Sequence, residues 1–434
     1  MMKNAENVAF LRNLRDAVGE VLGSCIRKTK IMHENAQKSM IKKAMTPGAP
    51  QRRPVRDGLA HVLAEASGAC GDLGTFLPYV VLVLVAGLAA PAPVFAGFAV
   101  AYLMVALVYR LPIAVQPMKA FGVAILTGTV AGVEIAWGGA LLGALLVGFA
   151  CTPHLVRAAR AIPQSVVTGL QAGLGLLLGA LALRMIGGQW LLGAAAVAVL
   201  ALSFVLPRGP WALLLVVAAV AFGPLLGDGL SAPGSTLLAA GGAAGSTAHA
   251  PSLLDAVTFG VLPQLPLTLL NAVVVAAAVA RSLHGDAAQH VGERRLAATS
   301  GLVNLAMAPL GALPMCHGAG GISGHHRFGA RGMLAPLLLA GLCAAAALSG
   351  DAVVELLARI PAPVAGALLL YAAWDLAFSR RLFDARPDCR PVIAATALGT
   401  FGLGVLPGFA AGLAAEAVRA NIARRRAPAG RRRP

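Results

Sequence analysis

The sequence predicts an all-α membrane protein that crosses the bilayer many times. Of its 434 residues, 58% are hydrophobic and only 12% are charged. A soluble domain of this length could not bury so much apolar surface in one core. The 51 glycines are scattered through the apolar runs, as expected where transmembrane helices pack closely through small residues. Most of the chain is therefore expected to have the lipid bilayer as its solvent.

About 14 apolar segments, seven in each half, define the predicted fold. A membrane-spanning helix needs about 20 apolar residues, and half-spans are tolerated only inside protein or beside a cavity. The segments are 65–90, 92–109, 114–131, 134–152, 161–183, 188–206 and 210–226 in the first half, and 255–280, 296–312, 314–326, 333–349, 353–376, 390–403 and 405–419 in the second. They predict a first transmembrane repeat over 58–226, an extracytoplasmic loop over 227–256 and a second repeat over 257–419.

The basic residues give the predicted orientation. The formal net charge is +17, and Lys and Arg gather in residues 1–57, in the Arg-rich tail 420–434 and in short loops on one side of the predicted spans. By the positive-inside rule that side is cytoplasmic. Both termini are then cytoplasmic and the number of spans is even, in a multi-pass protein of the inner (plasma) membrane. Basic flanks of this kind contact anionic lipid, so nucleic acid is not an expected partner.

Two proline-marked breaks recur at nearly equal offsets. Pro117 and Pro314 are 197 residues apart, and Pro163 and Pro361 are 198 residues apart, with similar neighbours. Chance matching is the alternative, because the chain contains 27 prolines. Duplicated units are typical of secondary transporters. With seven spans in each half, the second copy must cross the membrane in the inverted orientation.

The first pair of breaks predicts an anion site. The runs 115–122 and 314–321 each place a proline near the start of a short helix, because proline lacks a backbone N–H and fits the first turn. A helix start carries about half a positive charge, and two starts that face each other would bind an anion. Ordinary proline kinks are the alternative, although Lys119 and His317 beside them would be costly in lipid-facing helices.

Polar side chains in otherwise apolar segments supply further candidates. Asp72, in the first segment, is a candidate proton carrier or a partner for Lys119. In the first segment of the second half, Gln264, Thr268 and Asn271 fall near one helical face. Neutral amides and hydroxyls suit an oxyanion, and hydrogen bonding between helices is the alternative role.

The histidines and cysteines do not predict a metal site. His317 can change charge near neutral pH, which makes it a second candidate for proton coupling. His325, His326 and Arg327 are expected to cap the cytoplasmic end of their segment. The six cysteines include no CxxC pair, and the histidines lack partners at zinc-binding spacing. No metal or cofactor is therefore expected.

Four motifs occur in a characteristic order along the chain. They are Gly71–Thr75 (GDLGT), Gln116–Lys119 (QPMK), Leu262–Thr268 (LPQLPLT) and Pro314–Gly321 (PMCHGAGG), the last followed by Arg327–Arg331 (RFGAR). From about residue 60 to 418 the chain resembles the molybdate transporter family, a branch related to the sulfate permeases. The resemblance implies seven-plus-seven inverted repeats with the third and tenth segments as half-helices. It also implies a core domain that moves against a gate domain.

The resemblance further implies a secondary active transporter, not an enzyme, of a small tetrahedral oxyanion. Importing a dianion against an inside-negative potential is costly, so we expect import to be coupled to protons. Molybdate is the expected cargo, and sulfate is the first alternative. The cargo would lie between the two helix starts. On the basis of the resemblance, the cargo would contact the helix starts at Met118, Lys119 and Ala120 and at Cys316, His317 and Gly318. The polar residues Thr75, Gln116, Gln264, Thr268 and Asn271 are further candidate contacts, and Asp72 and His317 are the candidate proton carriers because of their apolar surroundings.

Several alternatives stay open at this point. Bicarbonate or an organic carboxylate could use the same architecture. An intramembrane enzyme acting on a phosphorylated lipid, a channel and a receptor are alternatives of a different class. These residues do not determine the oligomeric state, and a homodimer is one of the alternatives.

Overall fold

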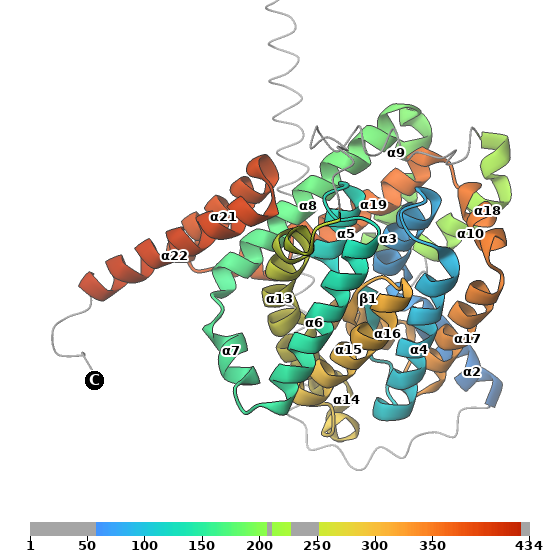
Figure 1. Ribbon diagram of the computed structural model, residues 1–434. Coiled ribbons are helices and arrows are strands. Elements are labelled where there is room, and N and C mark those ends of the chain that lie inside the picture. The colour runs from blue at the N-terminus through green and yellow to red at the C-terminus, as the bar shows by residue number, and fades with distance from the viewer. Residues whose placement is uncertain (1–57, 206–210, 227–250, 427–434) are drawn as a thin grey trace, which may run out of the picture. The chain divides into compact units, whose positions relative to one another are not determined.

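The computed structural model describes residues 58–205, 211–226 and 251–426. The predicted basic extension 1–57, most of the predicted loop 227–256 and residues 427–434 of the tail lie outside the described residues. Within the described ranges the chain is helical apart from turns, short connections and two three-residue strands (Figure 1).

The helices of the first half follow the predicted segments closely. Their bounds, with the first strand, are α2 (Gly58–Ala69), η1 (Cys70–Asp72), α3 (Leu73–Val85), α4 (Pro91–Tyr109), β1 (Val115–Pro117), α5 (Lys119–Leu126), α6 (Val133–Cys151), α7 (Leu155–Ala161), α8 (Gln164–Gly187), α9 (Trp190–Val205) and α10 (Trp211–Leu226). The predicted segment 114–131 is thus a strand followed by a short helix.

The second half also contains a strand that leads into a short helix, between longer helices. Their bounds are α12 (Leu253–Asp255), η2 (Ala256–Val261), α13 (Leu262–Leu267), η3 (Thr268–Val275), α14 (Ala276–His284), η4 (Gly285–Ala288), α15 (Glu293–Met307), η5 (Ala308–Leu310), β2 (Met315–His317), α16 (Ala319–Phe328), α17 (Leu334–Leu348), α18 (Asp351–Ala358), α19 (Ala362–Ala377), α20 (Arg380–Phe383), η6 (Pro387–Cys389), α21 (Arg390–Leu403) and α22 (Val405–Arg426). The first of these helices begins inside the predicted 227–256 loop.

Among the described residues, six helical stretches are long and apolar enough to cross a membrane. They are Gly58–Val85, Pro91–Tyr109, Val133–Cys151, Gln164–Gly187, Leu253–Ala288 and Ala362–Phe383. A seventh is counted if α17 and α18, which are bent by 101° at their junction, form one span. The chain is therefore a mostly helical, multi-pass membrane protein. The full number of 14 segments remains a prediction.

The predicted single segment 353–376 is wrong. The chain forms two helices there, because α18 ends at Ala358 and α19 starts after Pro361, which is its N-cap residue. Pro363 lies in the first turn of α19. The N–H groups of a first turn make no hydrogen bond within the helix, so the missing N–H of proline costs nothing there. Pro163 is the N-cap of α8 in the same way, so both members of this proline pair begin a long helix.

The two strands meet in the interior and pair antiparallel (Figure 1). Gln116 is opposite Cys316, with Val115 opposite His317 and Pro117 opposite Met315. Each strand leads directly into a short helix, α5 or α16. The two predicted proline-marked breaks are thus brought side by side although they are about 200 residues apart in the sequence.

Side chains from the neighbouring helices satisfy the strand backbone. The Tyr102 hydroxyl on α4 donates to the Val115 carbonyl at 2.9 Å. The Asn304 amide on α15 donates to the Met315 carbonyl at 2.6 Å and accepts from the Met315 N–H at 2.8 Å. Unpaired backbone groups are costly at membrane depth, and these contacts allow extended backbone inside the helical bundle.

Candidate functional site

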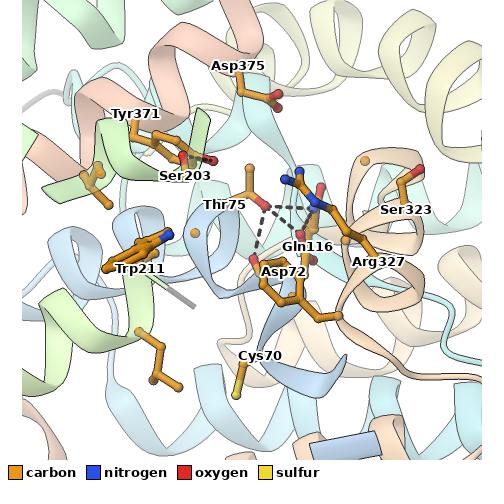
Figure 2. Close-up of a pocket in the computed structure, with 18 of the residues that line it drawn as sticks. Cys70, Asp72, Thr75, Gln116, Ser203, Trp211, Ser323, Arg327, Tyr371 and Asp375 are labelled. Atoms are coloured by element: carbon orange, nitrogen blue, oxygen red, sulfur yellow. Dashed lines mark hydrogen bonds between the residues drawn. The ribbon is translucent and has the colours of Figure 1, made fainter. Parts of the chain in front are cut away.

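A cavity of about 250 Å³ lies beside the paired strands (Figure 2). One wall is formed by η1, α3, β1, α5 and α16, and the other by α9, α10 and α19. Its polar and charged lining residues are Cys70, Asp72, Thr75, Gln116, Lys119, Ser203, Trp211, Ser323, Arg327, Tyr371 and Asp375. Four of the predicted site residues, Asp72, Thr75, Gln116 and Lys119, therefore share this cavity.

Asp72 is held by two neutral donors. The Thr75 hydroxyl donates to Asp72 Oδ1 at 2.6 Å, and Gln116 Nε2 donates to the same oxygen at 2.5 Å. Figure 2 shows these contacts as a closed triangle, because Gln116 Nε2 also lies 3.1 Å from Thr75 Oγ1. Asp72 is 3% exposed, and its second oxygen, Oδ2, has no hydrogen-bond partner among the described residues.

The alternative that Asp72 pairs with Lys119 is not seen. No ion pair in the described part of the chain joins the two residues, although both line the same cavity. The Asp72 carboxylate instead depends on Thr75 and Gln116, and its second oxygen is buried without a hydrogen-bond partner among the described residues.

Helix α16 presents a narrow polar stripe to the cavity. Gly320, Ser323, Gly324 and Arg327 all line it, and their spacing of three and four residues places them on one helical face. Gly71 in η1 packs on this face so closely that a Cβ added to it would lie 2.5 Å from the Gly324 carbonyl. The stripe therefore runs from the start of α16 near β2 to the exposed Arg327 near its end.

The start of α5 is already occupied by a protein group. The Ala120 N–H donates to Gln264 Oε1 at 2.8 Å, and Gln264 Nε2 donates to Thr268 Oγ1 at 2.9 Å. Both side chains are buried away from the cavity lining. Asn271 accepts a hydrogen bond from Arg381 at 2.5 Å. The structure therefore places the predicted trio Gln264, Thr268 and Asn271 outside the cavity.

His317 also lies away from the cavity. Its Nε2 is 2.8 Å from Thr299 Oγ1, and its Nδ1 is 3.2 Å from the Ala114 carbonyl oxygen. Thr299 in turn lies 2.7 Å from the Tyr109 hydroxyl. Cys316 is paired with Gln116, which lines the cavity. Successive residues of a strand face opposite sides, so the neighbouring His317 faces away from the cavity, behind the strand pair. Both ring nitrogens are engaged there.

The remaining predicted contacts surround the cavity without lining it. Met118 is fully buried and is the N-cap residue of α5, and Ala120 is buried in its first turn. Cys316 is half-buried in β2. Gly318 touches the Gln116 side chain, so an added Cβ would collide with it. These residues shape the helix starts and support Gln116.

The cavity contains residues that the sequence analysis did not assign to a site. Arg327, which is expected to cap the cytoplasmic end of its segment, lies in the last turn of α16 and also lines the cavity, as do Asp375 and Tyr371 on α19. Ser203 Oγ on α9 lies 3.5 Å from the Tyr371 hydroxyl. A carboxylate inside the apolar segment 353–376 was a usable signal for Asp375, because such residues are rare in membrane helices.

The formal charges of the lining residues balance. Lys119 and Arg327 contribute two positive charges, and Asp72 and Asp375 contribute two negative ones. The described residues contain no group of three or more His, Cys, Asp or Glu side chains that could hold a metal ion. The arrangement offers hydrogen-bond donors, two cations and two carboxylates at one place.

A multi-pass helical bundle with a mixed-charge cavity beside two strand–helix breaks is the arrangement expected of a membrane transport protein. The chain belongs to the family described as "Molybdate transporter of MFS superfamily", whose model matches residues 64–178 and 256–376. The resemblance predicted from the four motifs is confirmed. Because the family consists of transporters, the intramembrane-enzyme alternative is set aside.

Individual relatives and solved structures agree with this assignment. Molybdate transporter 2 of Arabidopsis thaliana is 27% identical over 413 residues, which covers 81% of this chain and 86% of that protein. Molybdate transporter 1 of Chlamydomonas reinhardtii is 44% identical over 125 residues, covering 27% of this chain and 24% of that protein. Both are transporters by name.

Two solved structures of anion transporters share the fold. The transmembrane domain of the cyanobacterial bicarbonate transporter BicA is 18% identical, with a TM-score of 0.52, over 82% of this chain and 97% of that one. Murine Slc26a9 in its inward-facing state is 14% identical, with a TM-score of 0.60, over 86% and 70%. At these identities the comparison establishes the fold alone.

Proposed function

We propose that the chain is a proton-coupled importer of a small tetrahedral oxyanion, with molybdate as cargo and sulfate as the alternative. The observation that carries this proposal is the cavity in which Thr75, Gln116, Lys119 and the start of α16 converge. Relatives matched over most of this chain are named molybdate transporters, which favours molybdate over other anions of the same shape.

The cavity has the chemistry that an oxyanion needs. The Lys119 ammonium and the Arg327 guanidinium supply positive charge, and Arg can bind two oxygens at once. Ser323 and Gln116 add neutral donors. Gly320 has no atom within 4 Å of the place where a Cβ would be, so an anion can approach the backbone N–H groups at the start of α16.

We further propose the complete architecture of seven-plus-seven inverted repeats. Its support is reciprocal packing: α4 packs on α17 while α15 packs on α6, and α8 packs on α21 while α19 packs on α9. Helices α5 and α16 begin 200 residues apart, at Lys119 and Ala319. In this scheme α2–α7 with α12–α18 form the core, and α8–α10 with α19–α22 form the gate.

The proposed orientation places both termini in the cytoplasm, in the inner (plasma) membrane. The exposed cavity residues Ser323, Arg327 and Asp375 lie close in sequence to the Arg-containing loops 327–331 and 380–386. The positive-inside rule puts those loops on the cytoplasmic side. We infer that this conformation is open to the cytoplasm, as expected for the release step of an importer.

Coupling to protons follows from the membrane potential. Importing a dianion against 100 mV, inside negative, costs about 4.6 kcal/mol, at roughly 2.3 kcal/mol per charge. Two protons per cargo ion would offset that cost. Of the two predicted carriers, Asp72 is supported by its place in the cavity and by its unpartnered oxygen, whereas His317 is engaged behind the strands.

The proposal is tested by uptake of radiolabelled molybdate into proteoliposomes with an inward proton gradient. We expect accumulation in the wild type and at least a tenfold loss in Lys119→Ala. Arg294→Ala is the matched control, because Arg294 is an exposed cation outside the cavity lining. Strong competition by excess sulfate would show that the protein carries tetrahedral oxyanions in general and does not select molybdate. Uptake that ignores an imposed pH gradient would contradict proton coupling.

A further inference from the structure

The two carboxylates of the cavity come from opposite walls. Asp72 lies at the junction of η1 and α3, and Asp375 lies on α19. Asp375 is exposed, and none of the hydrogen bonds or ion pairs recorded for the described residues uses its carboxylate. Figure 2 shows Asp375 and Asp72 on different sides of the cavity, with Thr75 between them in the view.

Asp375 shares its surroundings with several titratable groups of the described elements. The charged and titratable groups that line the same cavity are Cys70, Asp72, Lys119, Arg327 and Tyr371. From α3, Tyr79 is near enough to interact electrostatically with Asp375. Helices α9 and α10 bring no charged side chain. Helix α8 brings Arg184, but to the opposite end of α19, where Gly366 packs beside Ala182 and Met185.

An incoming dianion upsets the charge balance of this cavity. The empty cavity is formally neutral, with two cations and two carboxylates. A bound dianion would add two negative charges beside both carboxylates, and a like charge at this range favours the protonated, neutral carboxylic acid. A protonated carboxyl group can also donate a hydrogen bond to an oxyanion, whereas an ionised one can only repel it.

We propose that Asp375 is the second proton acceptor of the transport cycle, acting together with Asp72 across the cavity. The inference rests on the proposed function. As the dianion enters from the water outside, Asp72 and Asp375 each bind one proton. The two protons are then released together with the dianion to the water inside. The cavity is then formally neutral when empty and when loaded, and the cycle moves no net charge. His317, with both ring nitrogens engaged elsewhere, is not needed.

The test measures protons and molybdate together in proteoliposomes, with an entrapped pH dye and a radiolabel, at set membrane potentials. We expect two protons per molybdate and no dependence on potential in the wild type. Asp375→Asn should carry one proton and one net negative charge. Its equilibrium accumulation should then change about 50-fold per 100 mV, since one charge corresponds to roughly 2.3 kcal/mol. Glu355→Gln, an exposed carboxylate on α18 outside the cavity, should behave as the wild type.

Exchange of molybdate for molybdate at equal pH on both sides distinguishes a variant that has lost proton coupling from one that has lost its structure. Exchange requires no net proton movement, so a folded variant without coupling can still perform it. Asp375→Asn should retain exchange. Two results would overturn the inference alone: two protons per molybdate in Asp375→Asn, or loss of both exchange and molybdate binding in that variant. Uptake driven by a sodium gradient in place of the proton gradient would contradict the proposed proton coupling and, with it, the inference. No uptake of either oxyanion by the wild type would instead contradict the proposed function itself.

Discussion

Gln116 Nε2 lies 2.5 Å from Asp72 Oδ1, so a strand residue fixes the carboxylate of a helix junction 44 residues earlier in the chain. Gln116 is also the residue paired with Cys316 at the centre of the two strands. The position of Asp72 is therefore coupled to the place where the two halves of the chain meet. Movement of the strand pair would be transmitted directly to this carboxylate.

This relationship predicts that Gln116→Leu lowers molybdate uptake at least tenfold while the protein remains in the membrane. The substitution removes a hydrogen bond to a charged group, an interaction of about 1.5–3 kcal/mol, and leaves Thr75 as the only described donor to Asp72 Oδ1. Uptake normalised to membrane abundance checks it. Gln189→Leu, at an exposed position between α8 and α9, is the control and should remain active.

Glu65 is predicted to hold the start of α17. Its carboxylate, 1% exposed, accepts hydrogen bonds from the N–H groups of Arg331 at 2.7 Å, Gly332 at 2.9 Å and Ala335 at 3.1 Å. Glu65→Gln replaces one acceptor oxygen with a donor, so at least one buried N–H loses its partner. We expect a loss of about 1–3 kcal/mol in stability, seen as a lower melting temperature in detergent. An unchanged melting temperature would show that this cap is dispensable.

Two glycines are predicted to respond differently to substitution by alanine, because only one of them packs against backbone. Gly71→Ala would push a Cβ against the Gly324 backbone, which cannot move aside as a side-chain end could. Overpacking of this kind costs about 1–3 kcal/mol, and we expect a lower melting temperature and weaker uptake. Gly148→Ala on α6 meets nothing within 4 Å and should be neutral or slightly stabilising, because alanine favours the helix by up to about 1 kcal/mol.

Substitution of the two predicted proton carriers should distinguish a role in proton coupling from a role in structural stability. Asp72→Asn is expected to reduce the number of protons carried per molybdate, because Asp72 lies in the cavity. His317→Gln should lower thermal stability by breaking the contacts with Thr299 and Ala114, with the proton stoichiometry unchanged. The pH-dye assay combined with melting curves distinguishes the two. A lower stoichiometry in His317→Gln would restore histidine as a carrier.

Much of the fold was predictable because its signals are local. Apolar length marked the long helices, and the absence of a backbone N–H made proline a reliable sign of helix starts. Pro163 precedes α8 near the start of the predicted segment 161–183, and Pro117 and Pro314 mark the two strands. The break between α18 and α19 was missed, because the stretch is mostly apolar and mean hydropathy does not show where a helix ends and the chain changes direction.

The sequence by itself determined the membrane class, the two broken helices and the presence of Asp72, Thr75, Gln116 and Lys119 near them. Only the tertiary structure decided which side chains face the cavity. It turned Gln264 inward to cap α5, placed His317 behind the strands, and brought Arg327 and Asp375 to the lining. The physical reason is that facing depends on which helices pack together across about 200 residues of sequence, and no local pattern of apolar and polar residues specifies that pairing.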